Sequence, residues 1–167
     1  MRSPLALGCL AVIAGADYVI LRHTPRWIVV GLFDHPAHLA TAELIRLNLR
    51  PRSRKWTAGY RAGALLPDLD HLPLALRAVH PSPGDPRPVT HCLLAVAPAA
   101  AWALARDREA PAGAAAGMLA HFARDLGVGT GAPLLWPLTG RQLRVPYFLY
   151  AAACVLLARR ATLVGGL

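Results

Sequence analysis

The sequence predicts an all-α fold, an integral-membrane helical bundle with about four to five short hydrophobic helices. Hydrophobic residues make up 55% of the 167 residues and charged residues only 16%, whereas soluble domains average roughly 45–50% and about 25%. The mean hydropathy of +0.39 agrees with a membrane protein. Alanine and leucine dominate the apolar segments, and apolar positions do not alternate with polar ones as in a half-buried strand.

Six helical segments are expected, each bounded by residues that begin or end helices. Asp34 is a candidate N-cap, with Pro36 in the first turn of its helix. Pro67 ends the third segment, Thr90 caps the fourth and Gly127 ends the fifth. No segment has the clean run of about 20 apolar residues that a straight span needs. In chain order, the segments cover residues 5–21, 34–49, 56–66, 91–105, 112–126 and 145–160.

Residues 1–32 are interpreted as an N-terminal hydrophobic anchor that precedes a membrane-embedded domain at residues 33–160. The apolar run Leu5–Ile13 is followed by the small residues Ala14–Ala16, which satisfy a signal-peptide cleavage pattern, so a cleaved signal peptide is the alternative. The apolar stretch then resumes and meets a basic residue at Arg22, which favours a retained anchor.

The charge balance of 18 basic to 9 acidic residues does not indicate nucleic-acid binding, because the basic residues are scattered over the segment junctions. The sequence has no basic stripe with interleaved aromatic residues and no nucleic-acid-binding motif. Basic junctions are instead typical of cytoplasmic loops beside membrane helices. Cys9, Cys92 and Cys154 are far apart and form no Cys-x-x-Cys pair, so neither a thiolate zinc site nor a disulfide framework is expected.

The first candidate chemical motif is Pro67-Asp68-Leu69-Asp70-His71. Pro67 and Pro73 disfavour a continuous helix, because a proline biases its predecessor away from the α region. A turn can direct Asp68, Asp70 and His71 to one point, as the ligands of a zinc or manganese ion require. The alternative is a helix-capping aspartate beside an interfacial histidine.

The second motif is His121 and Asp125, which lie one helical turn apart on one face and could chelate one ion. Alternatively, they form a hydrogen-bonded pair within a bundle, or Asp125 pairs with Arg124 or another arginine. Further ligands could come from histidines near helix starts, namely His91, His38 and, less favoured, His35. Asp17 is an acid inside the first apolar segment and therefore also a functional candidate.

The order of these motifs resembles a family of small bacterial inner-membrane proteins that are catalogued as metal-dependent hydrolases. The family pattern comprises an early helical histidine, a Pro-Asp-x-Asp-His turn, a Thr-His step, a His-x-x-x-Asp helix and a Leu-Leu-Trp-Pro-Leu segment. The resemblance covers about residues 33–158. In this chain the corresponding residues are His38, Pro67–His71, Thr90–His91, His121–Asp125 and Leu134–Leu138.

The resemblance implies a multi-pass protein of the bacterial inner membrane that contacts membrane lipids and hydrolyses a phosphoester or lipid-like substrate. Its expected cofactor is one or two divalent ions, zinc or manganese. His71 is expected to be the general base or a further ligand, and Arg87 could clamp an anionic substrate. The expected metal ligands are His38, Asp68, Asp70, His91, His121 and Asp125.

One stretch departs from the family pattern. Many relatives carry His-Arg-Gly-x-Thr-His-Ser, whereas this chain has Pro86 and Cys92 in place of the first histidine and the serine. The departure favours an alternative hypothesis, a non-catalytic membrane protein with a structural metal site or a partner-binding site.

An ion transporter is less favoured, because the acids and histidines lie near segment ends. The His-x-x-x-Asp spacing is also similar to that of zinc ligands in zinc-dependent phospholipase C, which is an analogy between sites.

Overall fold

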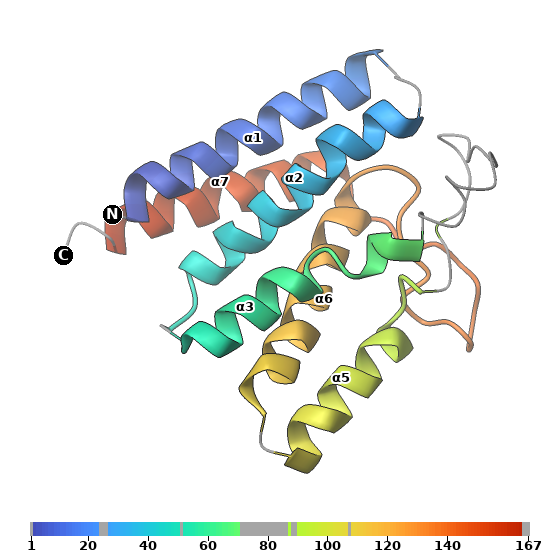
Figure 1. The fold of residues 1–167 in the computed structure, drawn as a ribbon. Helices are drawn as coiled ribbons and strands as arrows, with labels where there is room; N and C mark the ends of the chain where they lie inside the picture. Colours follow the sequence, from blue (N-terminus) through green and yellow to red (C-terminus); the bar gives the residue numbers. More distant parts are fainter. Residues whose placement is uncertain are drawn as a thin grey trace.

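The computed structural model describes residues 2–23, 27–50, 52–70, 87, 90–106 and 108–164. This part of the chain forms six α-helices and a short 3-10 helix without any β-strand, which confirms the predicted all-α class (Figure 1). The helices are α1 Arg2–His23, α2 Trp27–Leu47, α3 Arg54–Gly63, the 3-10 helix η1 Pro67–Asp70, α5 Leu93–Arg106, α6 Glu109–Gly127 and α7 Tyr147–Val164.

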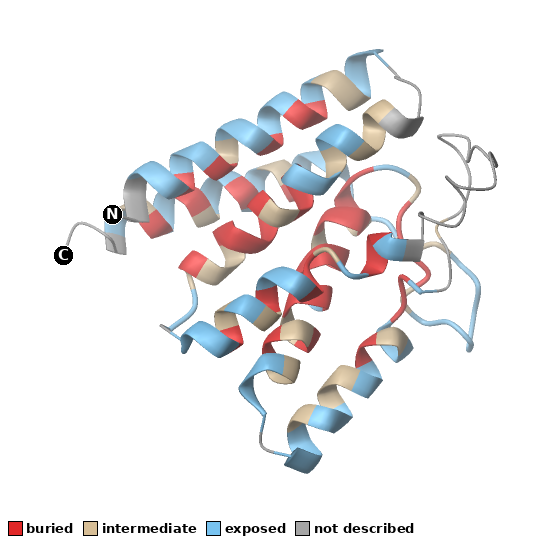
Figure 2. Ribbon diagram, in the orientation of Figure 1, coloured by how far each residue is buried: buried red, intermediate tan, exposed pale blue. Residues whose placement is uncertain are grey.

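The helices pack in two groups that meet at α2 and α6. Helices α1 and α7 pack against α2, while α3 and α5 pack against α6 (Figure 1). Buried apolar side chains fill three clusters, one among α1, α2 and α7, one among α2, α3 and α6, and one between α5 and α6. Buried residues therefore concentrate on α2 and α6, in the middle of the molecule (Figure 2).

Two predicted helix starts are wrong. Helix α2 begins at Trp27, so Pro36 lies inside it and Asp34 is not its N-cap. The Asp34 side chain instead pairs with Arg124 of α6, an interaction across 90 residues that has no local sequence signal. Helix α5 begins at Leu93, so Thr90 does not cap it.

The number of candidate membrane spans is smaller than predicted. Among the described helices, one is long and apolar enough to cross a membrane, namely Pro4–His23 with a mean hydropathy of 2.0. Helix α5 is apolar but short, and α2 carries charged and imidazole side chains that face the protein interior. A bundle of four to five membrane-spanning helices is therefore not confirmed.

Helices α3 and α6 approach so closely that each needs glycine at the contact. A Cβ atom on Gly59 or Gly63 would overlap a backbone carbonyl of α6, and one on Gly113 or Gly117 would overlap a carbonyl of α3. Both pairs follow the Gly-x-x-x-Gly spacing, which lets two helix backbones pack at short distance. The consequence is a rigid α3–α6 pair.

We expect Gly117→Ala to destabilise the protein by about 1–3 kcal/mol, the usual cost of forcing extra atoms into a packed contact. The added methyl group would overlap the carbonyl oxygen of Tyr60. Gly8→Ala is the matched control, because a Cβ atom on this helical glycine meets nothing within 4 Å. Denaturant unfolding in detergent measures the difference, and equal stability of the two variants would contradict the close packing.

Candidate metal centre

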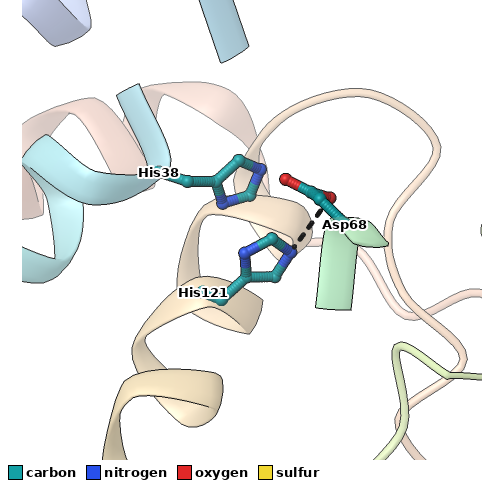
Figure 3. Close-up of side chains that lie close together, drawn as sticks. All are labelled: His38, Asp68 and His121. Carbon is teal, nitrogen blue, oxygen red and sulfur yellow. Dashed lines mark ion pairs between the residues drawn. The ribbon is translucent and has the colours of Figure 1, made fainter. Parts of the chain in front are cut away.

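Five of the predicted ligand residues converge at the junction of α2, η1 and α6. All five are buried. Figure 3 shows three of them, His38 from α2, Asp68 from η1 and His121 from α6, with their side chains turned toward one another. The complete group, which we call the His/Asp cluster, is His38, Asp68, His91, His121 and Asp125.

His121 is held in one orientation by a backbone hydrogen bond. Its Nδ1 lies 2.9 Å from the carbonyl oxygen of Ala64, which can only accept a proton, so Nδ1 is the donor. Nε2 is then the ring nitrogen whose lone pair can bind a metal ion. It lies 3.2 Å from Asp125 Oδ2 and 3.5 Å from Asp68 Oδ1. A backbone carbonyl on the second ring nitrogen is a usual feature of metal-binding histidines. Ala64 directly follows α3, so the close α3–α6 contact supports this geometry.

Two imidazole nitrogens and two carboxylate oxygens lie about as far apart as the ligands of one small cation. His91 Nε2 lies 3.5 Å from Asp68 Oδ1 and 3.9 Å from Asp125 Oδ2, and the two His121 distances are 3.5 and 3.2 Å. Zinc bonds to nitrogen and oxygen of about 2.0–2.2 Å place tetrahedral donors about 3.3–3.6 Å apart. These four side chains therefore fit a divalent cation of that size.

His38 contacts the second oxygen of the Asp125 carboxylate, and it offers a ligand atom within 4.8 Å of ligand atoms of Asp68 and His121. Its Nε2 is 3.4 Å from Asp125 Oδ1 and 3.5 Å from Asp34 Oδ2. The imidazole ring stacks on that of His121, with ring centroids 3.8 Å apart and an angle of 9° between the planes.

Several buried side-chain nitrogen and oxygen atoms of the cluster have no hydrogen-bond partner in the described part of the chain. They are both ring nitrogens of His38, Nε2 of His121 and Oδ2 of Asp125. Burying such atoms unsatisfied is costly, so native proteins rarely leave a group of them together. A bound cation would satisfy several at once, and this chemistry fits a divalent metal.

The acids of the cluster are ionised. Burial alone would raise the pKa of Asp125, but the Arg87 guanidinium, His38 and His121 outweigh burial and lower it. The pKa of Asp68 is likewise held far below its usual range, because hydrogen bonding to His91 and the charges of nearby histidines exceed the effect of burial. Both side chains are thus carboxylates, the form that binds metals.

The two stacked histidines differ in their protonation. Burial lowers the pKa of His38, and the neighbouring His121 lowers it further, so His38 is neutral and able to donate a lone pair. Burial also lowers the pKa of His121, but Asp125 and Asp68 outweigh it and raise the pKa above its ordinary value. A proton and a cation would therefore compete for Nε2 of His121.

The remaining predicted site residues are only partly described. Arg87 points into the cluster, with Nη2 3.0 Å from Asp125 Oδ1 and 3.1 Å from the Val128 carbonyl oxygen. His35 is half-exposed and its Nε2 lies 3.5 Å from Asp68 Oδ2. The side chain of Asp70 and the whole of His71 lie outside the described residues, so their predicted roles stay predictions.

A second buried polar group was not anticipated from the sequence. Arg124 is fully buried, and its Nη2 lies 2.8 Å from Asp17 Oδ1 and 2.7 Å from Asp34 Oδ1. Its Nη1 donates to the Tyr150 hydroxyl at 3.0 Å. This Arg124 network joins α1, α2, α6 and α7 beside the His/Asp cluster. The alternative that Asp125 pairs with an arginine is confirmed, but the partner is Arg87 and not Arg124.

In the part of the chain that the structure describes, the fold is all-helical, one helix is a candidate membrane span, and a buried His/Asp centre could hold a metal ion. The sequence model of the YdjM inner membrane protein family matches residues 5–164. The chain therefore belongs to this family of inner membrane proteins. The match begins within the segment interpreted as an anchor, and α1 packs against α2 and α7. No curated protein and no solved structure shows a significant match.

We expect the protein to fractionate with membranes and to resist carbonate extraction. Helix α1 is apolar and mostly outward-facing, with 28% of its span buried, and α7 exposes Phe148 and Leu156. Apolar surface of this extent needs lipid or detergent to cover it. Recovery of monodisperse protein from the soluble fraction without detergent would contradict this expectation.

Proposed function

We propose that this inner membrane protein is a metal-dependent hydrolase whose His/Asp cluster holds divalent zinc or manganese. The observation that carries the proposal is the orientation of His121. Its Nδ1 is hydrogen-bonded to the Ala64 carbonyl, and its Nε2, which has no hydrogen-bond partner among the described residues, lies 3.2 Å from Asp125 Oδ2 and 3.5 Å from Asp68 Oδ1. Imidazole and carboxylate ligands without thiolate suit zinc or manganese.

The side chains around the cluster can bind a substrate and move its protons. A bound divalent ion would polarise a phosphoryl or carbonyl oxygen and make a water molecule more acidic. Arg87 Nε is buried without a hydrogen-bond partner among the described residues, so it can donate to an anionic oxygen of the substrate. His71, which directly follows η1 in the sequence, is proposed as the general base.

A phosphoester or lipid-like substrate is supported by the loop that follows α6. The Leu93 amide donates to the Leu134 carbonyl oxygen at 3.0 Å, which places this loop beside the start of α5 and near His91. The next residues, Leu135 and Trp136, are exposed, and Leu138 is 89% exposed. An apolar rim near His91 suits the apolar part of an amphiphile, whose anionic headgroup Arg87 could bind.

Metal content and hydrolysis measured on the same sample test the proposal. Detergent-purified protein is analysed for metals and assayed with phosphomonoesters, phosphodiesters, phospholipids, carboxylic esters and amides. We expect stoichiometric zinc or manganese and hydrolysis of at least one phosphoester, lost on chelation and restored by the metal. Stoichiometric metal without hydrolysis of any substrate would favour the structural-site alternative, and absence of metal binding would exclude both.

A further inference from the structure

The stacked rings of His38 and His121 are not arranged to bind the same cation. The lone pair of an imidazole nitrogen lies in the plane of its ring, so a metal ion bound there lies close to that plane. The two planes are inclined by only 9° and the ring centroids are 3.8 Å apart. Nitrogens of the two rings and an oxygen of Asp68 lie within 4.8 Å of one another, but no position between the rings lies in both ring planes, so in-plane bonding favours a separate ion for each histidine.

The carboxylate of Asp125 faces both histidines with different oxygens. Oδ2 lies 3.2 Å from His121 Nε2, whereas Oδ1 lies 3.4 Å from His38 Nε2. In two-metal sites a carboxylate often lies between ions that are about 3.5–4 Å apart. Asp125 is thus placed to bridge two ions.

Asp34 supplies a further carboxylate oxygen beside His38. Arg124 holds Asp34 Oδ1 through Nε at 2.8 Å and Nη2 at 2.7 Å. The other oxygen, Oδ2, lies 3.5 Å from His38 Nε2, which is fully buried and has no hydrogen-bond partner among the described residues. Asp34 lies one helical turn before His38, so α2 presents both side chains to the same point.

We propose that the centre binds two divalent cations, which share Asp125 as a bridging ligand, and that Asp34 is a ligand of the second. Asp68, His91, His121 and Asp125 Oδ2 bind the first ion. Asp34, His38 and Asp125 Oδ1 bind the second. The inference rests on the proposed metal-binding function and adds to it a second ion and a ligand.

The net charge of the site determines how strongly the second ion binds relative to the first. Among the described residues, four carboxylates and two guanidinium groups leave a net charge of −2, which one divalent cation balances. The second cation leaves an excess positive charge, which an anion such as phosphate neutralises. The second ion therefore binds more weakly than the first and is strengthened by phosphate. The groups counted are Asp17, Asp34, Asp68, Asp125, Arg87 and Arg124.

The test uses full-length, detergent-purified, metal-depleted protein, with Mn²⁺ as the probe and with or without inorganic phosphate. Bound Mn²⁺ per chain is measured by equilibrium binding, and electron paramagnetic resonance distinguishes isolated ions from a coupled pair. We expect two Mn²⁺ per chain with phosphate present, and the spectrum of a coupled pair. Saturation at one ion, or two ions without coupling, would overturn the two-ion centre.

Asp34→Asn separates this inference from the proposed function. It keeps the size of the side chain, so we expect the first ion to remain and the affinity for the second to fall at least about 10- to 100-fold, the cost of losing even a supporting group. Glu43→Gln is the matched control, because Glu43 is a buried acid of the same helix that pairs with Arg46 and Arg61. It should retain both ions.

His38→Gln provides an independent variant if Asp34→Asn does not fold, and it should also lose only the second ion. Retention of two ions with unchanged affinity in either folded variant would overturn the inference. One ion in wild type, unaffected by Asp34→Asn, would overturn it and leave the proposed function standing. Failure of the wild type to bind Mn²⁺ or Zn²⁺ at all would overturn both.

Discussion

Asp125→Ala is expected to abolish stoichiometric metal binding. Asp125 places one oxygen toward His121 and the other toward His38, so its removal takes a carboxylate from both halves of the His/Asp cluster. The affinity should fall by more than the about 10- to 100-fold that loss of a supporting group costs. Hydrolytic activity should fall with it. Metal content after size exclusion measures the effect.

The helix itself should remain folded in this variant, because alanine is a good helix former. Arg87 loses its partner but is partly exposed and can reach water. Glu109→Ala is the matched control, since Glu109 is an acid at the start of the same helix and bonds to Ser53 instead. Full metal occupancy in Asp125→Ala, or equal loss in Glu109→Ala, would show that the site is wrongly assigned.

Arg124→Met is expected to cost about 3–5 kcal/mol of folding free energy, the usual effect of removing one partner of a buried ion pair. Arg124 is fully buried, and methionine would leave Asp17 and Asp34 without their common counter-charge. Tyr150 would lose a donor to its hydroxyl as well. Denaturant unfolding in detergent measures the loss.

Arg160→Met, on the exposed surface of α7, is the control and should change stability by less than about 0.5 kcal/mol. Because Arg124 joins α1 to the three other helices, Asp17→Asn should also destabilise the protein, by a smaller amount. A stability of Arg124→Met equal to that of the control would show that the network does not hold the bundle together.

The helical fold was predictable because its signal is local. Segments that are rich in alanine and leucine, and in which apolar and polar residues do not alternate, form helices whatever their packing partners are. The start of α2 was not predictable in this way. Asp34 has the chemistry of an N-cap, but its carboxylate binds Arg124 across 90 residues, and the apolar residues before it continue the helix.

The metal ligands were predictable from residue type and spacing, and the structure places five of the six predicted ligands together, as the His/Asp cluster. Asp34 and Arg124 were not, because each gains its role from a partner on another helix. The Gly-x-x-x-Gly pairs of α3 and α6 were a readable signal for the close helix contact. The predicted number of spans is not confirmed, since apolar content does not distinguish a lipid-facing helix from one buried in protein.

The most direct test of the metal centre is the position of anomalous scattering from zinc or manganese in crystals of the protein. The account predicts an anomalous peak about 2.0–2.2 Å from His121 Nε2 and bonded also to Asp68, His91 and Asp125. A second peak near His38 and Asp34 would support the two-ion centre. Metal located only at surface residues, with His121 Nε2 hydrogen-bonded to protein or water instead, would contradict the account.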